Sequence, residues 1–404
     1  MAVLSKLPGK QYFEISKTPD IGAPNGQGGE WLIDPFSITV VAGGGNFDIN
    51  NSSPFVSNFL EVGSAQLGVD LILQALNAGD VEIRTGNPVP VFDFGNIIWN
   101  ADLDFNNSTN NSTLSLDAIG SIFFNQSIFD STPGGDVLNL VAVAGISIIF
   151  NADISTQGSL IANAPTVNLN SGYNLKSNNN PILVLADTFD SDNNNFVNTS
   201  INAGSSTITL APFAPGTSLN IGTGPGILSL TDKDNPNIPD NFTTSSLLIF
   251  GISTTGPVTV YNVFIEQENV VINSGSSVTF TGTGVSSEFG SLTINASGDI
   301  SVNSSIKLNN GDFSAASSSG DFTLASNTSI STPAKIIITA NNITNNGTFS
   351  AGGTINLNGT ITNLPPDTTL QQGEDAANFF QDDFAKTGND QALADGNGPP
   401  LPGC

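Results

Sequence analysis

A short motif that recurs along the chain places the strongest constraint on its fold. Each copy has two apolar residues separated by one residue, then Asn, then two variable residues and a further apolar residue. The first three copies open at Ile97, Ile122 and Ile148, which are 25 and 26 residues apart. Repeats of about 20 to 50 residues are typical of solenoids, propellers and other arrays. The five copies are GNIIWNADL at 95–103, GSIFFNQSI at 120–128, SIIFNADI at 147–154, GDISVNSSI at 298–306 and INLNGTI at 355–361.

The pattern inside each repeat favours one of these architectures. Apolar residues alternate with polar ones in short runs, as in Ile300 and Val302, so one face of each strand is apolar. A single repeat cannot bury that face, whereas parallel strands stacked about 4.8 Å apart bury it continuously. The turns lack regular hairpin signals, and no helices of about 10–15 residues separate the strands. We therefore predict an all-β chain that forms a single parallel β-helix with short helical and loop insertions.

Composition divides the chain into three parts. The tail contains Ala376, Phe380 and Phe384, which share a helical face, so we predict a short helix that caps the last repeat. Docking of a partner protein on this segment is the alternative. The three parts are a polar lead-in at 1–28, the parallel β-helix repeat body at 29–363, and an acidic tail with Pro and Gly at 364–404.

Two segments interrupt the repeats. Residues 70–79 contain good helix formers between Asp70 and Gly79, and we predict a short helix with Asp70 as its N-cap. Residues 222–251 are rich in Gly and Pro and then acidic, which indicates a loop or an insertion in one turn.

The recurring Asn has a structural interpretation. It follows the first strand of each motif, and Asn tolerates the left-handed bend of a corner better than other residues with a side chain. Amides stacked at the same corner can bond to the amides above and below them. A binding site lined by Asn is the alternative. The residues of this predicted corner ladder are Asn100, Asn125, Asn151, Asn303 and Asn358.

Charge excludes some classes of partner. Asp and Glu number 35 and Lys and Arg only 9, which gives a net charge of −26. Such a chain cannot neutralise phosphates, so we expect no nucleic-acid partner and no binding to anionic membranes. The sequence contains no run of about 18 apolar residues, so we expect no integral membrane segment. The first residues do not resemble a signal peptide.

Several motifs also occur in an order that suggests a family. WLIDPFSITV at 31–40 is followed by LQALNAG and VEIRTG, and then by the first repeats. Further along, STITLAPFAPGTSLNIG precedes ILSLTDKD. This order resembles the filamentous-haemagglutinin-type exoproteins, which include two-partner-secretion adhesins and autotransporter passengers. The resemblance covers roughly residues 29–362, the repeat body without the N-terminal secretion domain of that family.

The resemblance implies a right-handed parallel β-helix at the surface of a Gram-negative cell or outside it. It implies a structural stalk or adhesin segment that mediates attachment or cell–cell contact, and not an enzyme. The implied partners are glycans or proteins of a host or a neighbouring cell, with an outer-membrane partner transporter if the chain is exported. The molecule is expected to be a monomeric rod. An unexported paralogue fragment without activity is an alternative.

A polysaccharide-active enzyme, a hydrolase or a lyase, is a further alternative, because parallel β-helices also host such activities. Asp187, Asp190 and Asp192 form the best carboxylate cluster, and two of them could act as acid and base on a glycosidic bond. Lyases that act on acidic sugars need a cation beside the substrate, and this region offers only Lys176.

The same stretch suggests a calcium site. Asp190, Asp192 and Asn194 have the spacing of the first three oxygen ligands in a calcium loop. Asn195 replaces the usual glycine and Ile201 the usual glutamate, so an exposed acidic turn is the alternative. No other cofactor is expected.

Overall fold

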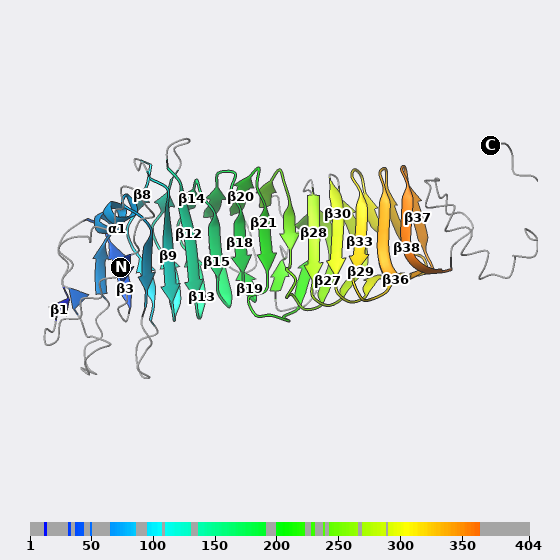
Figure 1. Ribbon diagram of the computed structural model, residues 1–404, viewed down its shortest axis with the longest axis horizontal. Helices are drawn as coiled ribbons and strands as arrows, with labels where there is room; N and C mark the ends of the chain where they lie inside the picture. The colour runs from blue at the N-terminus through cyan, green and yellow to red at the C-terminus, as the bar shows by residue number, and fades with distance from the viewer. Residues whose placement is uncertain are drawn as a thin grey trace, which may run out of the picture.

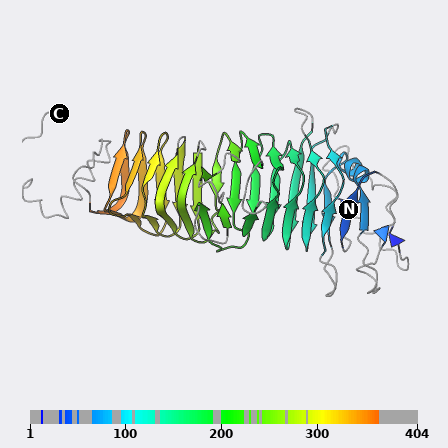
Figure 2. The same cartoon turned by 180° about the vertical axis from the view of Figure 1, so that it is seen from behind.

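The chain forms an elongated stack of short parallel strands (Figure 1 and Figure 2). The prediction of an all-β parallel β-helix is therefore confirmed. Most of the lead-in and the whole tail, with its predicted capping helix, lie outside the described residues. The computed structural model describes residues 12–13, 31–33, 37–43, 49–50, 65–85, 95–106, 110–130, 136–190, 199–222, 228–230, 237–238, 242–265, 269–287 and 290–363.

The strands form three parallel ladders, because each regular turn contributes one strand to each ladder. The first ladder contains, in order, β2 (Trp31–Ile33), β6 (Val81–Arg84), β9 (Ser112–Ala118), β12 (Leu138–Ala144), β15 (Leu160–Asn163), β18 (Ile182–Leu185), β21 (Ile208–Ala211), β26 (Leu248–Phe250), β28 (Asn269–Ser274), β30 (Ser291–Ala296), β33 (Phe313–Ser317) and the first halves of β36 (Ile336–Asn345) and β38 (Ile355–Thr362).

The second and third ladders are built in the same way. The second contains β5 (Ala65–Gly68), β3 (Ile38–Val41), β7 (Ile97–Trp99), β10 (Ser121–Phe124), β13 (Ser147–Phe150), β16 (Thr166–Leu169) and β19 (Thr188–Asp190), and then β23 (Leu228–Leu230), β22 (Leu219–Gly222), β27 (Val258–Ile265), β29 (Val278–Ser287), β31 (Ile300–Val302), β34 (Phe322–Leu324) and the second halves of β36 and β38. The third contains β8 (Leu103–Asp104), β11 (Ile128–Phe129), β14 (Ile154–Thr156), β17 (Asn174–Ser177), β20 (Ser200–Gly204) and β25 (Phe242–Thr244), and then β24 (Asn237–Ile238), the second halves of β27 and β29, β32 (Ile306–Leu308), β35 (Ser329–Thr332) and β37 (Thr348–Ala351). Outside the ladders, β1 (Tyr12–Phe13) pairs antiparallel with β4 (Ile49–Asn50).

Inward-facing side chains fill the solenoid with an apolar core. Trp99, Phe124 and Phe150 occupy equivalent positions in successive turns, and all three are fully buried. The rings of Phe124 and Phe150 are stacked, with centroids 5.0 Å apart and an interplanar angle of 3°. The Trp99 ring is tilted against Phe124 at 6.5 Å. The alternation seen in the sequence thus becomes a stack of like residues along the axis.

The one helix of the described part lies near the N-terminal end of the stack (Figure 1). Helix α1 (Val69–Leu76) contacts β5, β6, β8 and β9 and buries Val69, Ile72, Ala75 and Leu76. The predicted helix is therefore present, but the prediction of Asp70 as N-cap is wrong. The N-cap is Gly68, and Asp70 lies in the first turn, where a carboxylate still complements the helix dipole.

One turn is irregular. Ile208 pairs with Leu248, so this turn takes 40 residues, whereas Ile182 and Ile208 are 26 apart. The extra length adds a second strand to two ladders: β22 and β23 in the second, β24 and β25 in the third. The second ladder is interrupted between β19 and β23, and the third between β25 and β24, because no strand pairing joins them in the described residues. The first ladder alone pairs directly across this turn, through β21 and β26.

Candidate functional site

The predicted carboxylate cluster is described only in part. Asp187 lies at the corner before β19, and its Oδ1 accepts a hydrogen bond from the backbone N–H of Ala214 at 3.0 Å. Asp190 ends β19, where its backbone is in register with Asn168, but its side chain lies outside the described residues. Asp192 and Asn194 also lie outside them. The enzyme alternative and the calcium site at 190–194 therefore stay predictions.

Within the described ranges, no group of three or more His, Cys, Asp or Glu side chains could hold a metal ion. No helix in that part of the chain is long and apolar enough to cross a membrane.

The corner after the second ladder carries a ladder of Asn side chains. Asn125 Nδ2 donates to Asn100 Oδ1 at 2.9 Å, and Asn151 Nδ2 donates to Asn125 Oδ1 at 2.7 Å. Asn170 Nδ2 continues the series by donating to Asn151 Oδ1. The amides thus connect four successive turns of the stack.

Two of the predicted ladder residues do not join this series of amides. Asn303 occupies the same kind of corner, and its backbone N–H donates to the Phe280 carbonyl oxygen at 2.9 Å. The equivalent position in the next turn is Ala325, which follows β34 and has no side-chain amide to pair with Asn303. Asn358 belongs to the first ladder, where its Nδ2 donates to Thr339 Oγ1 at 3.3 Å. Asn358 therefore does not stack with Asn100, Asn125, Asn151 and Asn170.

We expect Asn125→Ala to lower the free energy of unfolding by about 1–2 kcal/mol, because it removes two partly exposed amide hydrogen bonds. Asn303→Ala is the matched control, since the structure shows no hydrogen bond from the Asn303 side chain, and it should change stability by less than about 0.5 kcal/mol. Urea unfolding followed by circular dichroism measures both. Equal losses in the two variants would contradict the role of the ladder.

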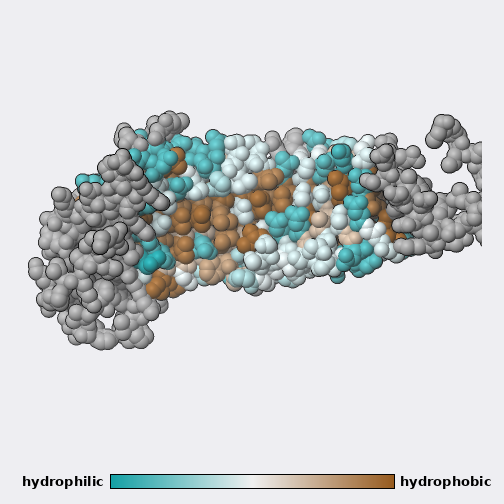
Figure 3. Space-filling model, viewed as in Figure 1, coloured by the Kyte–Doolittle hydropathy of each residue, from teal (hydrophilic) through white to brown (hydrophobic). Residues whose placement is uncertain are grey.

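The outward face of the first ladder carries an exposed apolar surface, which we call the apolar strip. Its residues are outward-facing and only partly exposed: Val141, Val143, Ile161, Leu183, Leu185, Ile249 and Val271. Figure 3 shows the corresponding hydrophobic area on the face that is seen in Figure 1. A parallel sheet of ordinary globular proteins is covered on both faces, and its strands then have continuous apolar runs. β12, with the sequence LNLVAVA, and β18, with ILVL, have such runs.

Strand register aligns these residues in two rows along the axis, interrupted by Thr209 in one row and by Asn163 in the other. Val141 is paired with Ile161, and Ile161 with Leu183. After Thr209 the same row continues with Ile249 and Val271. The outward positions of β12, β15, β18, β21, β26 and β28 include no charged residue.

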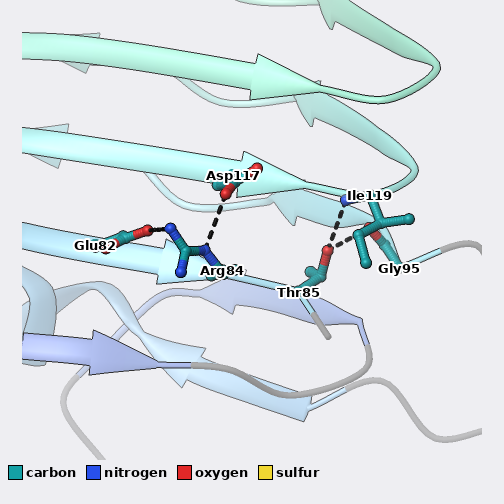
Figure 4. A network of polar contacts seen from close by, with 6 residues as sticks. All are labelled: Glu82, Arg84, Thr85, Gly95, Asp117 and Ile119. Carbon is teal, nitrogen blue, oxygen red and sulfur yellow. Dashed lines mark hydrogen bonds and ion pairs between the residues drawn. The ribbon is translucent and has the colours of Figure 1, made fainter. Parts of the chain in front are cut away.

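Charged residues border the strip on its N-terminal side (Figure 4). Arg84 in β6 forms ion pairs with Glu82 in the same strand and with Asp117 in β9, the latter at 2.9 Å. Glu82 and Arg84 occupy the same two rows that hold Val141 and Val143 two turns further on. The strip thus begins where this ion-pair cluster ends.

Further apolar side chains extend the surface around the corner to the second ladder. Ile119 is 39% exposed and Ile146 is 48% exposed, which makes them the two most exposed large apolar residues of the described part. In the second ladder, Ile98, Phe123 and Ile149 form an outward row. The apolar surface therefore covers parts of two adjoining faces.

The geometry defines a parallel β-solenoid with internal side-chain ladders and an uncharged apolar strip. No protein-family model, no curated protein and no solved structure matches the chain. Any functional conclusion therefore comes from the residues themselves.

Proposed function

We propose that this chain is a structural, rod-forming segment of a surface or secreted exoprotein, and that it mediates cell–cell contact. The observation that carries the proposal is the uncharged apolar strip on a strongly acidic rod. The sequence resemblance to filamentous-haemagglutinin-type exoproteins points in the same direction.

The occupant that we propose for the strip is a second copy of the same chain. Its row of Val141, Ile161 and Leu183 repeats at the strand spacing of about 4.8 Å, so a second strip has the same period and interdigitates with the first. The strip carries no charged side chain, although the chain as a whole has a net charge of −26. Two copies can therefore meet there without burying unpaired charge, which is the usual obstacle between acidic proteins.

The size of the strip is compatible with a specific contact. Six strands spaced about 4.8 Å apart, with an average length of about five residues at about 3.3 Å each, give roughly 500 Å² per copy. The total of roughly 1,000 Å² reaches the lower limit of specific interfaces. A contact of this size is weak for a single pair of molecules, but many parallel pairs between two cell surfaces add up.

We expect the purified chain to dimerise in sedimentation velocity experiments and Ile161→Lys to stay monomeric. The ammonium group of the new lysine would be buried against the apolar surface of the partner. The dissociation constant of the dimer should therefore rise by at least about tenfold. Association of the unchanged chain should strengthen with salt, because salt screens the repulsion between the two acidic rods.

Ser155→Lys is the matched control. Ser155 faces outward from β14 in the third ladder, in the strand that precedes β15, so this change adds the same charge away from the strip. It should leave dimerisation unchanged. On cells that display the chain, clumping should follow the same order of variants. A chain that is monomeric at all concentrations, or clumping that Ile161→Lys does not reduce, would contradict the proposal.

A further inference from the structure

A pair of buried carboxyl groups lies at the corner between the third and first ladders. Asp130 follows β11 and is fully buried, and Asp136 precedes β12 and is 3% exposed. Asp130 Oδ2 accepts hydrogen bonds from the backbone N–H groups of Leu138 at 2.8 Å and Gln157 at 3.2 Å. Asp130 Oδ1 and Asp136 Oδ2 are both buried and have no hydrogen-bond partner.

The fold does not need carboxylates at this corner. In the next turn the equivalent residue is Thr156, whose hydroxyl donates to the Gly158 carbonyl oxygen at 2.9 Å. In the turn after that it is Ser177, which donates to the carbonyl oxygen of Asn180. A neutral hydroxyl therefore closes the corner in these two turns, and its oxygen is hydrogen-bonded in both. The two carboxyl groups need a different explanation.

No side chain in the described part of the chain neutralises the pair. The ion pairs found there join Arg84 to Glu82 and Asp117 only. Burial raises the pKa of Asp130, and the nearby charges of Asp136 and Asp104 raise it further, whereas the two backbone N–H bonds lower it. A bare carboxylate is therefore unfavourable at this corner, and a bound cation would supply the missing counter-charge.

We propose that Asp130 and Asp136 bind a divalent cation, calcium. Both free atoms are carboxylate oxygens, the donors that hard cations prefer, and two carboxylates supply the charge that one divalent ion balances. Calcium tolerates irregular geometry and completes its shell with backbone carbonyl oxygens and water, so it does not need a third acidic residue. Such an ion would join the strands of two ladders at one corner.

The test is thermal unfolding of the full chain in calcium chloride and in EDTA, combined with calorimetric titration of calcium. Because a ligand of the folded state stabilises it, the unfolding midpoint should rise with calcium concentration. Asp136→Asn should abolish this rise and weaken calcium binding by at least about tenfold. Asp102→Asn is the matched control, since Asp102 is exposed and its Oδ1 accepts only a backbone N–H from Ser127, which the amide retains. It should keep the full response.

Two results would overturn the proposal. If Asp136→Asn keeps the calcium response, the ion binds elsewhere, for example at 190–194. If the unchanged chain shows no calcium response, the corner holds no ion and the proposal fails. Should Asp136→Asn fail to fold, Asp130→Thr carries the side chain that the next turn uses, and it should show the same loss of calcium binding.

Discussion

Phe124→Ala is expected to lower the free energy of unfolding by about 3–5 kcal/mol, among the largest effects of any single substitution in this chain. Phe124 is fully buried and lies between Trp99 and Phe150 in the aromatic stack. The change leaves a cavity that the neighbouring turns cannot fill, because their backbones are fixed by the ladders on both sides. It also removes two aromatic contacts, each of about 0.5–1.5 kcal/mol.

The neighbouring residue provides the control. Phe123 lies in the same strand but faces outward, so Phe123→Ala should cost less than about 1 kcal/mol. Urea unfolding of the two variants, followed by circular dichroism, compares the same chemical change on opposite faces of one strand. A similar loss in both variants would show that the two faces are equally buried and would argue against the assigned register.

Gly251→Ala is expected to lower stability by about 2–5 kcal/mol, for two reasons that add. Gly251 has a φ of +78°, which residues with a Cβ avoid. A Cβ at this position would also lie 2.1 Å from the backbone oxygen of Asn273, in the next turn. That oxygen belongs to β28 and cannot move without shifting a strand of the first ladder.

Gly216 separates these two contributions. Its φ is +79°, but a Cβ there would have no atom within 4 Å. Gly216→Ala should therefore cost only the backbone strain, about 1–2 kcal/mol. Thermal or urea unfolding of both variants measures the difference, which is the energy of the clash between turns. If Gly216→Ala lowers stability as much as Gly251→Ala does, then the close approach of Asn273 is not the reason why position 251 requires glycine.

The parallel stack was predictable because it depends on local alternation that every turn repeats. The same holds for Asn100, Asn125 and Asn151, whose spacing follows the strand register. Asn170 was missed, although Val167, Leu169 and Asn170 fit the motif, because that turn is only 19 residues long. Asn358 was placed in the wrong ladder, since all three ladders use the same apolar pattern and the motif does not tell them apart.

The candidate sites were harder to predict. The apolar strip does leave a signal, the consecutive apolar residues of LVAVA and ILVL, but a single strand does not show that its neighbours align to form a surface. The burial of Asp130 has no local signal at all. The residue follows an apolar run just as Asn and Thr do at other corners, and only the three-dimensional corner makes its carboxyl group inaccessible to water.

The irregular turn between Ile208 and Leu248 has a consequence for how the rod unfolds. Among the described strands, two of the three ladders stop on one side of this turn and restart on the other, and β21 and β26 are the strand pair that continues across it. In a stack whose stability is the sum of contacts between nearest neighbours, such a joint is where cooperativity is weakest. We therefore expect the two parts of the rod to form separate units of hydrogen exchange and to yield in two steps under tension.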